Sequence, residues 1–302
     1  MGRAWNPLMK LQGIFPAVAT PFNHEGEIWK AKVEHNVSKW NALDLAGYVI
    51  TGSTGESALL SAAERIQLWE WVAQYAAPEK LLIAGTASES VRETVELAGL
   101  AASFGYRAAL VLTPHYYKGQ FNNAAAQKLF YGAVADQSKI PILLYNLPQN
   151  TGIELTADAV VELSHHPNIA GIKDSSGDVG KLIRMVSEVK PGFPVLTGNA
   201  ATLAPALAAG ASGAILALAN AAPYACISIW EANRTREAGA AMDWQRRIEK
   251  PSRISSVKHG IPGLKHAMDL MGYYGGPPRL PFVAPSPQAK LEIEEAFADL
   301  RG

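Results

Sequence analysis

One lysine directly follows a short apolar run, in a position where its amine could do chemistry. The run Ile169–Ile172 is typical of a buried strand, and Lys173 comes next, before a polar turn. Burying an ammonium is costly unless it is paired or loses its proton, and a neutral amine is a nucleophile. Two interpretations are open: Lys173 either reaches solvent at the end of the strand or is a buried catalytic amine.

Tyrosines lie at the ends of two other apolar runs and could exchange protons with that amine. Tyr145 is the last residue of the run Pro141–Tyr145. Tyr116 and Tyr117 follow the run Ala108–Leu112. A tyrosine in such a place is usually an amphipathic packing residue. Several of them near a lysine favour acid–base chemistry instead, because a phenol and an amine can exchange protons in a buried site.

A Gly-rich turn, Thr51–Ser57, follows another apolar run and is suited to bind an anion. Gly52 and Gly55 let the backbone turn tightly and expose its N–H groups. The hydroxyls of Ser53 and Thr54 add further donors. Such a turn fits a carboxylate or a phosphate, although a plain turn with a capping serine would explain the same residues. It is not a P-loop, since no Gly-Lys-Ser/Thr follows.

Eight apolar runs with helical stretches between them must position these side chains. Continuous apolarity is typical of strands covered on both faces, and the spacing fits repeated strand–helix–strand units. The pattern predicts a (β/α)8 TIM barrel, in which active sites lie at the C-terminal ends of the strands. The runs are Phe15–Thr20, Tyr48–Thr51, Leu81–Gly85, Ala108–Leu112, Pro141–Tyr145, Ile169–Ile172, Pro194–Thr197 and Gly213–Leu216.

The C-terminal part of the chain loses the strand pattern. Residues 222–247 are predicted to be helical, and Gly260–Gly272 and Pro287–Leu300 are predicted to form further helices. We therefore expect two parts: a barrel with the active site over residues 1–222, and a small C-terminal helical appendage over residues 223–302.

Composition excludes several classes of function. The chain has 302 residues, 48% of them hydrophobic, as expected for a globular protein with a large core. Its 27 basic and 27 acidic residues cancel, so we expect no nucleic acid and no membrane as partner. Cys226 is the only cysteine, which excludes an internal disulfide and suits a cytoplasmic protein. His165 and His166 lack partners at metal-site spacing, so no metal is expected.

Four motifs resemble the dihydrodipicolinate synthase / N-acetylneuraminate lyase family. Its members are class I lyases that form a Schiff base with pyruvate and related 2-oxo acids on a (β/α)8 barrel. The resemblance runs from about Gly13 to Pro281 and implies a small 2-oxo acid substrate and no cofactor. The motifs are Gly52–Glu56, Thr113–Tyr117, Tyr145–Pro148 with Thr151 and Gly152, and Gly171–Asp174.

The resemblance implies catalytic roles for the lysine and the tyrosines. Lys173 would form the imine, and Tyr145 would carry protons to and from it. Tyr116 would complete the proton relay, often from the neighbouring subunit of a tight dimer. Tyr117 would take that role if the loop is shifted by one residue. By the same resemblance, we expect a homo-oligomer, a dimer of dimers.

The resemblance also implies a set of substrate-binding residues. Ser53 and Thr54, together with Gly52, would bind the carboxylate of the 2-oxo acid, and Ser53 would also relay protons. Ser175 could add a hydroxyl to the site, although a turn-capping role explains it equally well. Ile215, in the last apolar run, is also expected to contact the substrate.

Asn150 departs from the family pattern in a way that bears on the substrate. The dihydrodipicolinate synthases usually carry an arginine there, which holds the carboxylate of aspartate semialdehyde, and asparagine cannot form that bidentate charged pair. We therefore rank cleavage of 4-hydroxy-2-oxoglutarate to pyruvate and glyoxylate first. The alternatives are condensation of pyruvate with aspartate semialdehyde and another 2-oxo acid lyase or dehydratase reaction. A non-catalytic 2-oxo acid binding protein is a remote alternative.

Overall fold

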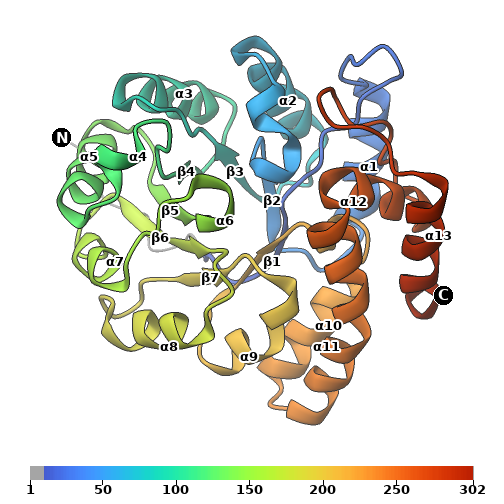
Figure 1. Cartoon of the computed structure of the whole chain (residues 1–302). Coiled ribbons are helices and arrows are strands. Elements are labelled where there is room, and N and C mark those ends of the chain that lie inside the picture. Colours follow the sequence, from blue (N-terminus) through green and yellow to red (C-terminus); the bar gives the residue numbers. More distant parts are fainter. Residues whose placement is uncertain (1–9, 302) are drawn as a thin grey trace.

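The computed structural model describes residues 10–301, which form a parallel barrel surrounded by helices (Figure 1). Eight strands pair in the order β1-β8-β7-β6-β5-β4-β3-β2, and a bridge between Ala17 and Val49 links the two ends. The predicted (β/α)8 fold is therefore confirmed. The strands are β1 (Gly13–Pro16), β2 (Gly47–Ile50), β3 (Leu81–Gly85), β4 (Ala108–Leu112), β5 (Ile142–Asn146), β6 (Ile169–Asp174), β7 (Val195–Thr197) and β8 (Gly213–Leu216).

Helices alternate with the strands and cover the outside of the barrel (Figure 1). Several begin with a side chain that caps the first turn. Ser61 and Glu64, for example, form the reciprocal capping box at the start of α2. The helices before the last strand are α1 (Lys30–Asn41), α2 (Ala62–Tyr75), α3 (Val91–Ser103), α4 (Lys118–Phe121), α5 (Ala124–Gln137), α6 (Pro148–Thr151), α7 (Ala157–Leu163), α8 (Val179–Glu188) and α9 (Leu203–Ala208).

The C-terminal helices pack beside β1 and over one side of the barrel (Figure 1). The stretch predicted to be helical over residues 222–247 is two helices, because the chain turns at Arg236, which has a φ of 64°. A π-helical segment at Arg253–Lys258 then joins α11 to α12. The division of the chain after residue 222 stays a prediction. These helices are α10 (Pro223–Arg234), α11 (Ala238–Ser252), α12 (Gly260–Leu270) and α13 (Pro287–Ala296).

Apolar side chains fill the barrel interior and form the floor beneath the strand ends. Phe15, Val49, Leu110 and Leu196 belong to this cluster and are fully buried. Such packing makes the barrel a solid core and not a pore. None of the helices within residues 10–301 combines the length and the apolar composition that a membrane crossing requires.

A buried ion pair joins the turn after β2 to the C-terminal helices. The Nζ atom of Lys265 in α12 lies 2.6 Å from Oε1 of Glu56, and both side chains are almost completely buried. The backbone N–H of Arg279 donates to the other carboxylate oxygen of Glu56 at 2.9 Å. Burial lowers the pKa of Lys265, and the Glu56 carboxylate opposes this effect. The pair therefore holds the Gly-rich turn against α12.

Arg279 extends this connection toward α2. Its guanidinium donates to both carboxylate oxygens of Glu64, at 2.6 and 3.0 Å, and to the carbonyl of Leu59. These bonds lower the pKa of the Glu64 carboxyl. The segment that follows α12 thus binds both the loop between β2 and α2 and the first turn of α2.

We predict that Lys265→Met lowers the free energy of unfolding by about 3–5 kcal/mol, because it leaves the buried Glu56 carboxylate unpaired. Urea unfolding followed by circular dichroism measures the change. Lys250→Met is the matched control, since Lys250 pairs with Glu295 at the surface. Its expected effect is below about 1 kcal/mol. Equal effects of the two substitutions would contradict the importance of the buried pair.

Candidate active site

Lys173 lies inside strand β6, next to Tyr145 of β5. The two residues are paired in the sheet register, and Leu196 of β7 pairs with Lys173 on its other side. The Nζ atom of Lys173 lies 4.2 Å from the centroid of the Tyr145 ring. The lysine is only 4% exposed, so its amine does not extend into bulk solvent. Of the two interpretations of this lysine, the structure favours the buried amine.

The amine has no carboxylate partner within the described part of the chain. The ion pairs that lysines form there involve other residues, including Lys181 and Lys265. Among the described residues, no ion pair therefore occupies the amine of Lys173, and its nitrogen can approach a substrate in the cavity.

Tyr145 contacts both the lysine and the Gly-rich turn, the lysine with its ring and the turn with its hydroxyl. The hydroxyl lies 3.5 Å from Oγ of Ser53, a long contact in which Tyr145 is the donor. Ser53 begins a 3-10 turn that ends at Gly55, and Gly52 precedes it in an extended conformation. The turn is held by Thr20, whose hydroxyl donates to the carbonyl of Gly55 at 2.6 Å. Tyr145 thus lies beside the amine with its ring and beside Ser53 with its hydroxyl.

A cavity of about 460 Å³ lies above these groups. Seven of its lining residues were predicted from the sequence, and Gly52 is buried just behind Ser53. The size is sufficient for a small organic acid. The seven predicted lining residues are Ser53, Thr54, Tyr145, Asn150, Lys173, Ser175 and Ile215.

The C-terminal helices form the far wall of the cavity, which the sequence did not reveal. This wall includes Ser252 at the end of α11, Ser256 in the π-helical segment and Ile261 in α12. No local pattern marks these residues, because they reach the site only through the packing of distant helices over the barrel. π-helical segments are frequent at functional sites, but no pattern in the sequence predicts the one at Arg253–Lys258.

Tyr116 and Tyr117 lie outside the cavity of their own chain. They are 76% and 71% exposed, and their rings pack edge to face with centroids 5.0 Å apart. The Glu89 carboxylate accepts the backbone N–H groups of His115 and Tyr116, which holds this loop in place. One chain alone therefore does not bring Tyr116 to Lys173, and its role stays a prediction.

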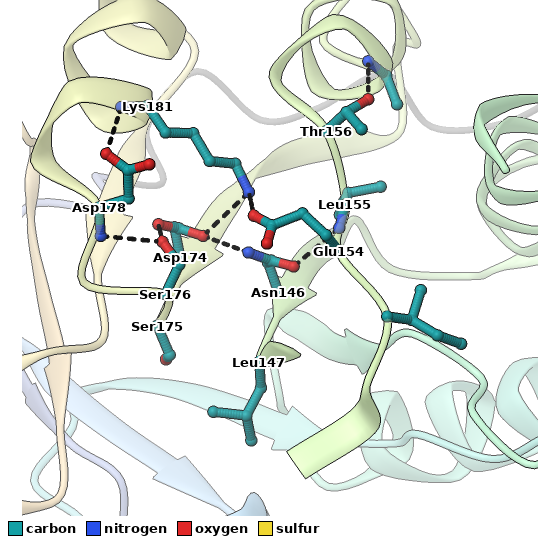
Figure 2. A network of polar contacts seen from close by, with 12 residues as sticks. Asn146, Leu147, Glu154, Leu155, Thr156, Asp174, Ser175, Ser176, Asp178 and Lys181 are labelled. Carbon is teal, nitrogen blue, oxygen red and sulfur yellow. Dashed lines mark hydrogen bonds and ion pairs between the residues drawn. The ribbon is translucent and has the colours of Figure 1, made fainter. Parts of the chain in front are cut away.

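A polar network fixes the ends of β5 and β6 on the side away from the cavity (Figure 2). Asn146 donates to the Asp174 carboxylate at 2.6 Å and accepts the Leu155 N–H at 2.9 Å. Asn146 follows Tyr145 and Asp174 follows Lys173, so the network holds the neighbours of the two cavity residues. In Figure 2, the side chain of Ser175 points away from this network.

Gly198, just after β7, leaves the space that Lys173 and Ser175 occupy. A Cβ atom at this position would lie 1.9 Å from Oγ of Ser175 and 3.0 Å from Cε of Lys173. The Gly198 N–H also donates to the carbonyl of Asp174 at 2.7 Å. A larger residue here would therefore force the side chains of Ser175 and Lys173 to move.

Comparison with known proteins decides which family has this site. The model of the dihydrodipicolinate synthetase family matches residues 10–299. The chain belongs to this family. Members are lyases and synthases that act through a Schiff base, and this chain is an enzyme of that class.

Family relatives carry two kinds of name. A 4-hydroxy-tetrahydrodipicolinate synthase from Exiguobacterium sp. is 32% identical over 290 residues, which cover 94% of this chain and 96% of that protein. A probable mitochondrial 4-hydroxy-2-oxoglutarate aldolase from Emericella nidulans is 34% identical over 293 residues, covering 95% and 94%. The family suspected from the motifs is thus confirmed.

Solved structures of the family share the fold. The chloride-inhibited dihydrodipicolinate synthase from Acinetobacter baumannii, complexed with pyruvate, has a TM-score of 0.90 and 29% identity. The comparison covers 96% of this chain and 98% of that chain. A family member from a prophage of E. coli K12, also in complex with pyruvate, has a TM-score of 0.90 and 27% identity, covering 97% and 99%.

We predict that Gly198→Ala decreases the reactivity of the Lys173 amine toward pyruvate by about a hundredfold, because the new methyl group displaces Ser175 and Lys173. The measurement is borohydride trapping of the adduct, followed by mass spectrometry. Gly132→Ala is the control, since a Cβ there meets nothing within 4 Å. If Gly198→Ala traps pyruvate at the rate of the control, the close contact is unimportant.

Proposed function

We propose that this enzyme makes or breaks a carbon–carbon bond next to an imine that Lys173 forms with pyruvate. The observation that carries the proposal is the buried Lys173 amine, which has no carboxylate partner among the described residues. It lies 4.2 Å from the centre of the Tyr145 ring and is open to a cavity. The structures of two family members in complex with pyruvate support pyruvate as the 2-oxo acid.

Attack by the amine begins the reaction. The neutral Lys173 amine adds to C2 of the 2-oxo acid, and loss of water from the carbinolamine leaves a protonated imine. The turn with Ser53 and Thr54 holds the C1 carboxylate, which places C2 beside the amine. Because the positive imine accepts an electron pair, the mechanism calls for no cofactor.

In the cleavage direction, the C3–C4 bond breaks and its electron pair enters the imine as an enamine. Tyr145 gives its proton to the hydroxyl that leaves the carbinolamine as water, and the resulting phenolate accepts the proton of the C4 hydroxyl, so an aldehyde is released. Protonation of the enamine at C3 and addition of water then release pyruvate and restore the amine of Lys173. In the synthetic direction, the enamine attacks an aldehyde and the same proton returns from Tyr145.

A second copy of the chain would complete the proton relay. Tyr116 is exposed and lies on a loop that Glu89 holds in place, so it can enter a neighbouring subunit without refolding. We propose that Tyr116 reaches the Ser53 hydroxyl of a partner, with Tyr117 as the alternative, in a dimer of dimers.

The second substrate has two candidates. The relatives' names favour aspartate semialdehyde over the aldolase substrate that we ranked first from the sequence, because most carry the synthase name. Asn150 is the observation that keeps 4-hydroxy-2-oxoglutarate as a candidate. The described residues that line the cavity include no arginine and no lysine other than Lys173, so no guanidinium is present there to bind a second carboxylate.

We predict that borohydride with pyruvate adds one reduced adduct, located on Lys173, and that Lys173→Ala abolishes both adduct and turnover. Tyr145→Phe should still bind pyruvate but lower kcat by about 10²–10⁴-fold, because it lacks the proton carrier. Lys190→Ala, at an exposed lysine, is the control. Full activity of Lys173→Ala would refute the mechanism.

We predict a clear preference when the two substrates are compared as kcat/KM on the same preparation. An aldolase releases pyruvate from 4-hydroxy-2-oxoglutarate, and coupled reduction of the pyruvate measures it. A synthase consumes pyruvate only when aspartate semialdehyde is added. For the synthase, Asn150→Arg should raise kcat/KM for aspartate semialdehyde about tenfold or more, because a charged bidentate pair replaces a neutral contact. If kcat/KM does not increase in Asn150→Arg, another group binds aspartate semialdehyde.

A further inference from the structure

A second buried charge lies directly beside Lys173 in the sequence, on the other side of β6. Asp174 is only 2% exposed. Successive side chains of a strand point to opposite faces, so Lys173 faces the cavity and Asp174 faces the surrounding helices. The Asp174 carboxylate accepts hydrogen bonds from Asn146 and from the Ser176 hydroxyl, each at 2.6 Å. Both donors are neutral, so they stabilise its charge without cancelling it.

Lys181 supplies the opposite charge. It comes from the first turn of α8, and its side chain is 10% exposed. Its ammonium lies 3.7 Å from Oδ1 of Asp174 and also pairs with the Glu154 carboxylate. Figure 2 shows the ammonium between the two carboxylates. The geometry is an ion pair between buried groups, which solvent screens weakly.

The other groups around these charges are few. Asp178 is the N-cap of α8 and accepts the backbone N–H of Lys181. On the cavity side, Tyr145 is the titratable group beside Lys173 within the described lining. The segment after β7 presents Gly198 and Asn199 there, which carry no charge.

A buried carboxylate near a lysine favours the charged ammonium of that lysine. Such an effect would act against catalysis, because the ammonium of Lys173 cannot attack a ketone. Asp174 is the next residue of the same strand, and the protein that separates the two side chains screens charges less than water does. The ammonium of Lys181 reduces the negative potential that Asp174 produces at Lys173.

We propose that Lys181 is a positioning residue that neutralises Asp174 and so keeps Lys173 available as a neutral amine. This inference rests on the proposed function, because it concerns the amine that forms the imine. Lys181 touches neither substrate nor reacting atoms. It acts through Asp174, whose carboxylate joins β6 to Asn146 of β5.

The test is the pH dependence of imine formation in Lys181→Met, which preserves the length of the side chain without its charge. Pyruvate is trapped with cyanoborohydride over one pH series, and the trapping rate of each variant is divided by that of the wild type. We expect the rise of the rate with pH to move to higher pH by about one unit. The rate should recover fully at high pH.

Three variants separate the electrostatic effect from a structural one. Lys181→Arg keeps the charge and should keep the wild-type pH profile. Asp174→Asn/Lys181→Met removes both charges, so the pH at which the trapping rate rises should return to the wild-type value or fall below it. Glu154→Gln leaves the Asp174–Lys181 pair intact, so its rise should stay in place or move to lower pH. This milder variant serves if Lys181→Met does not fold.

The outcomes are distinct. If Lys181→Met lowers the rate equally at every pH, or if Glu154→Gln moves the rise to higher pH, the inference is wrong while the imine mechanism stands. If the wild type forms no pyruvate adduct at any pH, the proposed function fails and the inference fails with it.

Discussion

The constraint on which the rest of the site depends is a buried lysine amine that has no carboxylate partner within residues 10–301. An amine removed from water has few groups to hold it. The protein solves this by packing. Main-chain pairing with β5 and β7 fixes the backbone of Lys173 on both sides, and the Tyr145 ring lies beside the amine. The apolar floor of the barrel excludes water from below.

The pleat of two adjacent strands separates reacting groups from structural ones. On β5 and β6, Tyr145 and Lys173 face the cavity, whereas Asn146 and Asp174 hold each other on the outside. Each reacting residue is thus next to a residue that fixes its strand. If β6 slipped by one residue against β5, its side chains would turn to the opposite faces of the sheet. The hydrogen bond between Asn146 and Asp174 therefore also specifies the register.

The sequence predicts the strand ends well and the far wall of the cavity poorly, for a physical reason. Buried parallel strands leave continuous apolar runs, and Lys173 and Ser53 are conspicuous where such runs stop. Ser252 and Ser256 lie in helical sequence without any local distinction, and only long-range packing brings them to the cavity. Tyr116 is a third case, because its motif can be recognised in the sequence but the side chain lies outside the cavity of its own chain.

The buried pair of Glu56 and Lys265 has a consequence for how this sequence can diverge. Each charge is tolerable only because the other is present, so a single substitution must pass through a destabilised intermediate. The two positions are far apart in the chain, yet they should change together or not at all. A C-terminal segment taken from a relative would therefore need the matching turn after β2. The buried pair thus makes the turn at the mouth of the barrel and the helices that follow the barrel depend on each other.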